Sequence, residues 1–360
     1  MKDGKIRVGV IGVHPERGWA MTAHIPAFQS LSDYELVAMT NSHAQLGQQA
    51  AKKFSIPNAV QHHLDLVRRP DIDLVVVTVK VPHHFALASA ALKAGKSVYC
   101  EWPLGRDVSE AVELAKLAKN HKVHGAVGLQ SRATPVVRYV KDLIKDGYVG
   151  EVLSTSVVGS GIFWGATIPA SDVYTLDSKN GAGMINVSFA HGLDCVCYAL
   201  DSKMTEVKAI LENRRKSVQV IETNEMVPMT TPDQIAVNGK MENGTVVSVH
   251  YRGGLSRGTN FRWEINGTRG DLVITSSLGY PAVGEVNIQA GQDKDLAVHA
   301  LPIPSKYSSG NGLTGPALNV FYHYARLARD LKTGTHLSAT FDDAVVLHRL
   351  IDAIETSAKR

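Results

Sequence analysis

Three glycines in the turn that follows the first apolar run could bind a phosphate group. They lie in Val8-Gly-Val-Ile-Gly12-Val-His-Pro-Glu-Arg-Gly18-Trp-Ala20. Glycine lacks a Cβ, so the backbone can turn tightly there and approach a pyrophosphate closely. We expect a dinucleotide to contact Gly12, Val13, Gly18, Trp19 and Ala20. The Gly12-to-Gly18 spacing exceeds that of the compact G-x-G-x-x-G motif, so glycines that serve only a turn remain the alternative.

The second apolar run ends at Met39-Thr-Asn41-Ser42-His43, the point that would face the adenosine ribose. A carboxylate there would bind the 2′-hydroxyl of NAD and repel the 2′-phosphate of NADP. The segment contains no carboxylate, and Asn41, Ser42 and His43 can donate hydrogen bonds to a phosphate. We therefore expect the cofactor to be NADP or NAD, with NADP bound at least as tightly, unless these residues only form a turn.

A third run, Val76-Val-Thr78-Val79-Lys80-Val-Pro-His-His84, follows the most apolar stretch of the chain. In open α/β sheets, ligands bind beyond the carboxyl ends of the strands. We expect Thr78, Val79 and Lys80 to line the same ligand as the glycine turn.

The elements that must position these residues alternate between strand and helix patterns, which predicts βαβ units and a doubly wound parallel sheet over residues 1–128. After residue 129, hairpin signals predict an α+β domain with a large, mostly antiparallel open sheet over residues 129–360. The expected strands are 6–12, 35–40, 73–78, 97–100, 125–128, 152–158, 207–211, 235–241, 246–251, 261–265 and 272–274. The expected helices are 44–54, 85–94, 108–120, 134–146, 182–200, 316–332 and 342–357.

Composition excludes several classes of protein. The 38 basic and 34 acidic residues give a net charge of +4 without charge blocks, so nucleic acid is not an expected partner. No segment has the pattern of a signal peptide or a membrane span, and three cysteines are too few for a disulfide framework, so we expect a cytoplasmic protein. No histidine or cysteine spacing predicts a metal site.

Longer motifs resemble the Gfo/Idh/MocA family of NAD(P)-dependent oxidoreductases. Lys93-Ala-Gly-Lys-Ser-Val-Tyr-Cys-Glu101-Trp102-Pro103 is similar to the family's AGKHVxCEKP segment, and His84 looks like the histidine that precedes it. Further similar segments are His24-Ile-Pro-Ala, Leu129-Gln130-Ser-Arg132, Asp146-Gly-Tyr-Val-Gly and Ile265-Asn-Gly-Thr-Arg-Gly. The resemblance covers most of the chain.

This resemblance implies a cofactor site that also includes His84, Glu101, Trp102 and Gln130. In the family, the lysine of Glu-Lys-Pro polarises the reacting oxygen, and Trp102 takes its place here. An indole cannot supply that charge, but it could offer an apolar shelf to a sugar ring.

The family's D-x-G-x-H-x-x-D helix implies that His191 is the general base. Asn186 is the nearest substitute for the missing first aspartate, whereas a histidine on an apolar helix could also be a core residue. Arg132 and Trp164 complete the implied substrate site.

Three features resemble the branch that holds the galactose-regulon repressors of yeasts. They are the lengthened glycine turn, Trp102, and Gly161-Ile-Phe-Trp-Gly165. We therefore expect an oxidoreductase that acts on a sugar or cyclic polyol by hydride transfer, with a non-catalytic dinucleotide sensor acting through a protein partner as the alternative. A homodimer or dimer of dimers through the open sheet is expected.

Overall fold

The computed structural model describes residues 4–308 and 312–360 and divides into two compact units. The first unit contains residues 4–133 and 312–348, and the second contains residues 134–308 and 349–360. The continuous division expected at residues 128/129 differs from this one, because the chain returns to the first unit after completing most of the second. The reason is apolar packing: Val320, Phe321, Tyr324 and Leu327 belong to the same core as strands of the first unit.

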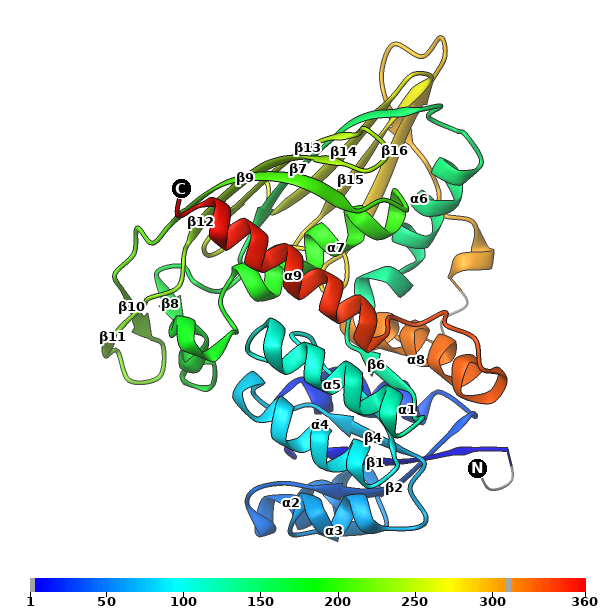
Figure 1. The fold of residues 1–360 in the computed structure, drawn as a ribbon, viewed down its shortest axis with the longest axis vertical. Coiled ribbons are helices and arrows are strands. Elements are labelled where there is room, and N and C mark those ends of the chain that lie inside the picture. The colour runs from blue at the N-terminus through cyan, green and yellow to red at the C-terminus, as the bar shows by residue number, and fades with distance from the viewer. Residues whose placement is uncertain (1–3, 309–311) are drawn as a thin grey trace. The chain divides into compact units, whose positions relative to one another are not determined.

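The first unit is built on a six-stranded parallel sheet in the order β3-β2-β1-β4-β5-β6 (Figure 1). The order changes direction between β1 and β4, the switch point at which such sheets bind ligands. Its strands are β1 (Ile6–Ile11), β2 (Tyr34–Thr40), β3 (Asn58–Val60), β4 (Leu74–Val77), β5 (Ser97–Cys100) and β6 (Gly125–Val127). Its helices are α1 (Ile25–Gln29), α2 (Ala44–Phe54), α3 (His63–Arg68), α4 (His84–Lys93), α5 (Val108–Asn120) and α8 (Gly315–Thr333), with a π-helical segment at Ala20–His24 and 3-10 turns at Val81–His83 and Gln130–Ala133.

Strand β4 shows why this sequence forms such a sheet. All four of its residues are fully buried, as a central parallel strand covered on both faces requires. At the start of the strand, Asp73 accepts hydrogen bonds from the Arg7 guanidinium at 3.1 Å and from the Arg7 backbone at 2.9 Å. These bonds tie the beginning of β4 to β1.

The second unit is built on an eight-stranded sheet in the order β17-β16-β15-β14-β7-β13-β12-β9. All neighbouring pairs are antiparallel except β7 and β13. The strands are β7 (Val152–Ser160), β9 (Met204–Glu212), β12 (Gln234–Met241), β13 (Val246–Arg252), β14 (Phe261–Gly267), β15 (Gly270–Ser276), β16 (Val286–Gln292) and β17 (His299–Ala300). The expected fold class, a doubly wound parallel sheet followed by a mostly antiparallel open sheet, is confirmed.

Smaller elements complete the second unit. A three-stranded sheet contains β8 (Thr167–Ile168), β10 (Ser217–Val220) and β11 (Met226–Pro228). The helices are α6 (Pro135–Lys145), α7 (Ala190–Ala199), which follows a π-helical segment at Ile185–Phe189, and α9 (Phe341–Ser357), which begins in the first unit and ends in the second; 3-10 turns lie at Ala170–Leu176, Ser178–Asn180 and Ser305–Tyr307. No helix within the described residues is long and apolar enough to cross a membrane.

Candidate functional site

The glycine turn after β1 is shaped as dinucleotide binding requires. Gly12 has φ +105°, and a Cβ there would lie 2.6 Å from Val79 Cγ1 and 3.1 Å from the Thr78 carbonyl oxygen. Gly18 has φ +90° with open space around its missing Cβ. Both positions therefore need glycine, one for close packing and one for backbone conformation. Open space surrounds the position that a Cβ would take at Gly18, so the backbone of the turn is accessible there.

The side-chain amide of Asn41 forms hydrogen bonds within the protein and is not free to meet the adenosine ribose of a dinucleotide. Its Nδ2 donates to the Val13 carbonyl oxygen at 2.7 Å, and its Oδ1 accepts from the His43 backbone N–H at 2.9 Å. The side chain therefore fastens the end of β2 to the glycine turn. Ser42, beside it, is exposed. Of the three residues expected to donate to a phosphate, Ser42 and His43 are exposed and Asn41 is half-buried.

His84 fastens the loop after β4 to the loop after β5. Its Nε2 lies 2.8 Å from the Val79 carbonyl oxygen and its Nδ1 lies 2.7 Å from the Pro103 carbonyl oxygen. Burial lowers the pKa of His84, which favours the neutral ring. A neutral imidazole has one N–H and can donate to only one of the two oxygens. His84 is therefore suited to position these two loops. Lys80, in the loop after β4, is exposed.

A buried polar cluster surrounds Glu101 at the end of β5. The carboxylate accepts hydrogen bonds from the Tyr99 hydroxyl at 2.9 Å and from Gln130 Nε2 at 2.8 Å to both oxygens, and it pairs with His24 Nε2 at 2.9 Å. The other ring nitrogen of His24 lies 2.6 Å from the Tyr324 hydroxyl. Gly128 makes room, since a Cβ there would lie 2.7 Å from Glu101 Oε2.

Electrostatics inside this Glu101 cluster favour a charged carboxylate. Burial alone would raise the pKa of Glu101, but His24, Gln130 and Tyr99 together hold that pKa below its usual value. Beside it, the buried ring of His323 meets Tyr99 edge-on at 5.4 Å, and burial lowers the pKa of His323 to about 3. Glu101 and Gln130, both expected to touch the cofactor, are thus occupied with each other.

Trp102 is packed inside the first unit. The indole is 5% exposed and lies 4.6 Å, centroid to centroid, from the ring of His348 on α9. Burial lowers the pKa of His348 to about 4, and its Nε2 has no hydrogen-bond partner among the described residues. The position that holds a lysine in the family's Glu-Lys-Pro segment therefore carries an indole here, and that indole packs on a neutral imidazole. Neither ring supplies a positive charge.

His191 lies in the second unit on the first turn of α7. Its ring stacks on Tyr280 at 4.6 Å with an interplanar angle of 4°. Asn186 lies on the partly exposed side of the π-helical segment just before α7. π-Helical segments of this kind often mark functional sites. The structure thus brings the two expected proton-transfer residues onto one continuous helical stretch.

Two expected substrate residues have other contacts. Trp164 is 1% exposed, and its indole N–H donates to the Thr175 carbonyl oxygen at 3.1 Å, so it is a core residue of the second unit. Arg132 belongs to the first unit, where its Nη1 lies 2.9 Å from Asp343 Oδ1. The residue with an exposed ring beside Trp164 is Phe163, which sequence reasoning did not select.

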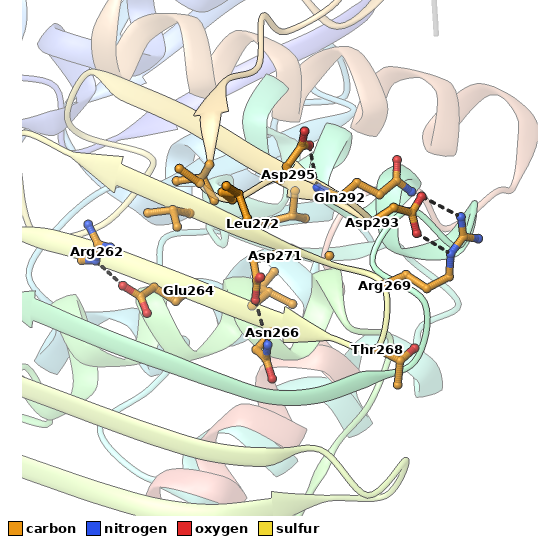
Figure 2. A pocket seen from close by; sticks show the side chains of 17 residues that line it. Arg262, Glu264, Asn266, Thr268, Arg269, Asp271, Leu272, Gln292, Asp293 and Asp295 are labelled. Carbon is orange, nitrogen blue, oxygen red and sulfur yellow. Dashed lines mark hydrogen bonds and ion pairs between the residues drawn. The ribbon is translucent and has the colours of Figure 1, made fainter.

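A hollow of about 580 Å³ lies over β14, β15 and β16 of the second unit, and none of its lining residues is an expected site residue (Figure 2). Several of its polar side chains pair with one another: Asn266 donates to Asp271 at 2.8 Å, and Arg269 lies 3.3 Å from Asp293. No group of three or more potential metal-ligating side chains occurs within residues 4–308 and 312–360.

Two family models match the chain. Residues 6–129 match the oxidoreductase family with an NAD-binding Rossmann fold, and residues 135–276 match the Gal80p C-terminal domain. The resemblance to the Gfo/Idh/MocA family is confirmed over residues 6–129. The NAD-binding class of the first unit, expected from the glycine turn and the motifs, is confirmed.

Relatives of this chain include a regulator and a dehydrogenase. It is 24% identical to the galactose/lactose metabolism regulatory protein GAL80 of Saccharomyces cerevisiae, covering 98% of this chain and 92% of the relative. It is 28% identical to dehydrogenase aclE of Aspergillus oryzae, covering 99% and 96%. Two solved structures share its fold. A super-repressor mutant of Gal80p from Saccharomyces cerevisiae has a TM-score of 0.88, with 24% identity over 99% and 96% of the two chains. A levoglucosan dehydrogenase complex with NADH and levoglucosan has a TM-score of 0.85, with 21% identity over 99% and 97%.

Sequence reasoning missed several residues that the geometry singles out. They are His323, Tyr324 and His348 in the first unit and Phe163 and Tyr280 in the second. His24 and Phe163 stood in quoted motifs without a role. The others lie far along the chain from their partners, and no local pattern links them.

Proposed function

We propose that this protein is an NAD(P)-dependent oxidoreductase that acts on a sugar or cyclic polyol. The residues proposed to contact the cofactor follow three neighbouring strands of the first unit: Gly12 and Gly18 after β1, Ser42 after β2, and Thr78 and Lys80 after β4. Val13, Trp19, Ala20, Val79 and Trp102 stay in the proposed set, while Asn41, His84, Glu101 and Gln130 would act by holding the loops in place. When bound, the nicotinamide accepts or returns the hydride.

The observation that carries this proposal is the stacked pair of His191 and Tyr280. A parallel stack fixes the plane of the imidazole. A residue that must hydrogen-bond one particular substrate hydroxyl needs such a fixed orientation. In the oxidation direction, His191 would take the proton of the substrate hydroxyl, and the bound dinucleotide would accept the hydride from the substrate carbon. Asn186 would hold a neighbouring hydroxyl. The Glu-Lys-Pro lysine has no counterpart, so His191 would be the principal group that meets the reacting oxygen.

A second candidate is a non-catalytic, dinucleotide-dependent regulator that acts through a protein partner. The packing of Trp102 on His348 favours it, because the cation that polarises the reacting oxygen elsewhere in the family is replaced by two neutral rings. The match of residues 135–276 to the Gal80p C-terminal domain supports the same candidate.

One paired experiment separates the candidates. NADH and NADPH binding is measured by calorimetry, and hydride transfer is followed at 340 nm with a panel of levoglucosan, inositol and galactose. Turnover on a panel member supports the enzyme. Tight dinucleotide binding without hydride transfer on any of them would favour the regulator.

The cofactor preference yields a sharper prediction at Ser42. We expect Ser42→Asp to weaken NADP binding by about 10- to 100-fold, roughly 1–3 kcal/mol, while NAD binding changes little, because only the 2′-phosphate meets the new charge. Asn41→Asp is the informative contrast: it also loses the amide bond to Val13, so both dinucleotides should weaken. Calorimetry with both dinucleotides gives the answer. A native preference of tenfold for NAD would contradict the proposal that NADP binds at least as tightly.

The oligomer is also part of the proposal. The outward face of the large sheet exposes Ile210 and Val246 among polar residues. We propose a homodimer or dimer of dimers formed through this face. Light scattering of the native protein tests it.

A further inference from the structure

Phe163 is an exposed aromatic residue that lies between buried residues of the second unit. It is 36% exposed, whereas Gly161, Trp164 and Gly165 are buried and Ile162 is half-buried. A single exposed apolar side chain needs no explanation by itself, so the case for ligand contact depends on how the backbone holds this ring.

The backbone on both sides of Phe163 is strained. Ile162 has φ +70° and Trp164 has φ +61°, both in the left-handed region that side chains other than glycine rarely adopt. A β-branched residue is especially unfavourable there. Such strain persists only where the surroundings over-determine it, and it concentrates at ligand sites. The alternation turns Trp164 inward and leaves Phe163 outward.

Hydrogen bonds and close packing hold this loop rigid. The Phe163 carbonyl oxygen accepts from the Gly254 N–H at 2.7 Å, and the Gly161 N–H donates to the Arg252 carbonyl oxygen at 2.7 Å. A Cβ at Gly253 would lie 2.1 Å from the Trp164 carbonyl oxygen, so the two segments are in close contact. The ring of Phe163 is therefore presented by a pre-organised backbone, which lowers the entropic cost of binding.

The same loop contacts the two segments that carry Asn186 and Tyr280. Ser188, in the π-helical segment that carries Asn186, donates to the Gly161 carbonyl oxygen at 2.8 Å. On another side, a Cβ at Gly279 would lie 2.0 Å from the Ser160 carbonyl oxygen, and the next residue, Tyr280, stacks on His191. Three segments distant in sequence thus meet around residues 160–163.

We propose that Phe163 forms the aromatic wall of a sugar-binding site within the second unit, an inference that rests on the proposed function. A pyranose or cyclitol presents a face of C–H groups, which packs on an aromatic ring, and a rim of hydroxyls, which the amide of Asn186 and the imidazole of His191 can bind. An apolar protein segment is the rival occupant. The polar groups on the adjoining π-helical segment favour the sugar.

Calorimetry of the full chain, saturated with NADH, tests the proposal with the same three sugars. We expect Phe163→Ala to raise the Kd of a bound sugar by about tenfold, a typical effect of removing a stacked ring. Phe163→Tyr keeps the ring and should stay within about threefold. Leu255→Ala is the matched control, because Leu255 is an exposed apolar residue that follows Gly254, and it should leave the Kd unchanged. Melting temperatures of all variants identify any loss of folding.

The outcomes separate this inference from the proposed function. A sugar that binds with a Phe163-dependent Kd but is not oxidised supports the inference while the enzyme proposal fails. If Phe163→Ala oxidises a sugar with the KM of the native protein, the inference is overturned and the enzyme proposal stands. Absence of binding of any panel sugar to the native protein also overturns it and turns attention to a protein occupant.

Discussion

Replacing His191 with alanine should lower single-turnover hydride transfer by about 10²–10⁴-fold, the usual contribution of a general base, while NADH affinity stays nearly unchanged. The reason is positional: His191 belongs to the second unit, and the glycine turn belongs to the first. The measurement pairs stopped-flow absorbance at 340 nm with calorimetry on the same preparation.

Controls at Tyr280 separate chemistry from packing. Tyr280→Phe preserves the ring that stacks on His191 and should retain most of the rate if only the stack matters. Tyr280→Leu removes the stack and should lower the rate while the imidazole is still present. If His191→Ala instead lowers the free energy of unfolding by about 1–3 kcal/mol and leaves the rate per folded molecule intact, His191 is a core residue.

Stability should fall steeply between pH 6.5 and pH 4.5. The folded-state pKa values of His323 and His348 are lowered to about 3 and about 4, whereas both groups titrate near 6.5 when unfolded. The unfolded state therefore binds more protons throughout this window, and the free energy of unfolding decreases as the pH falls. Each group contributes about 1.4 kcal/mol per pH unit. Above pH 6.5 this contribution is fully present.

Urea unfolding at several pH values measures that slope, and two variants divide it. His348→Phe keeps a ring against Trp102 but cannot titrate, so about half of the slope from this pair should disappear. Glu101 acts in a different window, because its pKa is lowered and its contribution is lost only as the pH falls below about 4.5. An unchanged slope in His348→Phe would show that His348 is not the source.

Local patterns predicted the architecture because its elements are locally encoded. The run from Leu74 to Val77 is apolar throughout and could only be a buried strand, and every expected helix lies where a helix forms, although 182–200 contains a π-helical segment and begins later. Strand β16 was not predicted, although Val286, Ile288 and Ala290 alternate with polar residues as in a half-buried strand. The β3, β8, β10, β11 and β17 strands are too short for alternation to be visible.

Side-chain roles were harder to predict because they depend on distant partners. An Asn-Gly pair is typical of a tight hairpin turn with both residues at positive φ. In Asn243-Gly244 only Gly244 has a positive φ, at +90°, and Asn266-Gly267 lies within β14. In Phe163-Trp164, the larger aromatic was expected to meet the ligand, but the positive φ of Trp164 turns it into the core. No spacing rule signals such a local reversal.

Helix α8 has a consequence for how the chain can acquire its structure. It follows the entire eight-stranded sheet in sequence, yet its Tyr324 stacks on Phe28 at 4.1 Å and its backbone accepts a hydrogen bond from Tyr34. A ribosome that has made only the first 133 residues has not yet made Tyr324, which contacts both His24 and Phe28. The first unit therefore stays incomplete while the second unit is synthesised. A fragment that ends at residue 133 should expose apolar surface and aggregate.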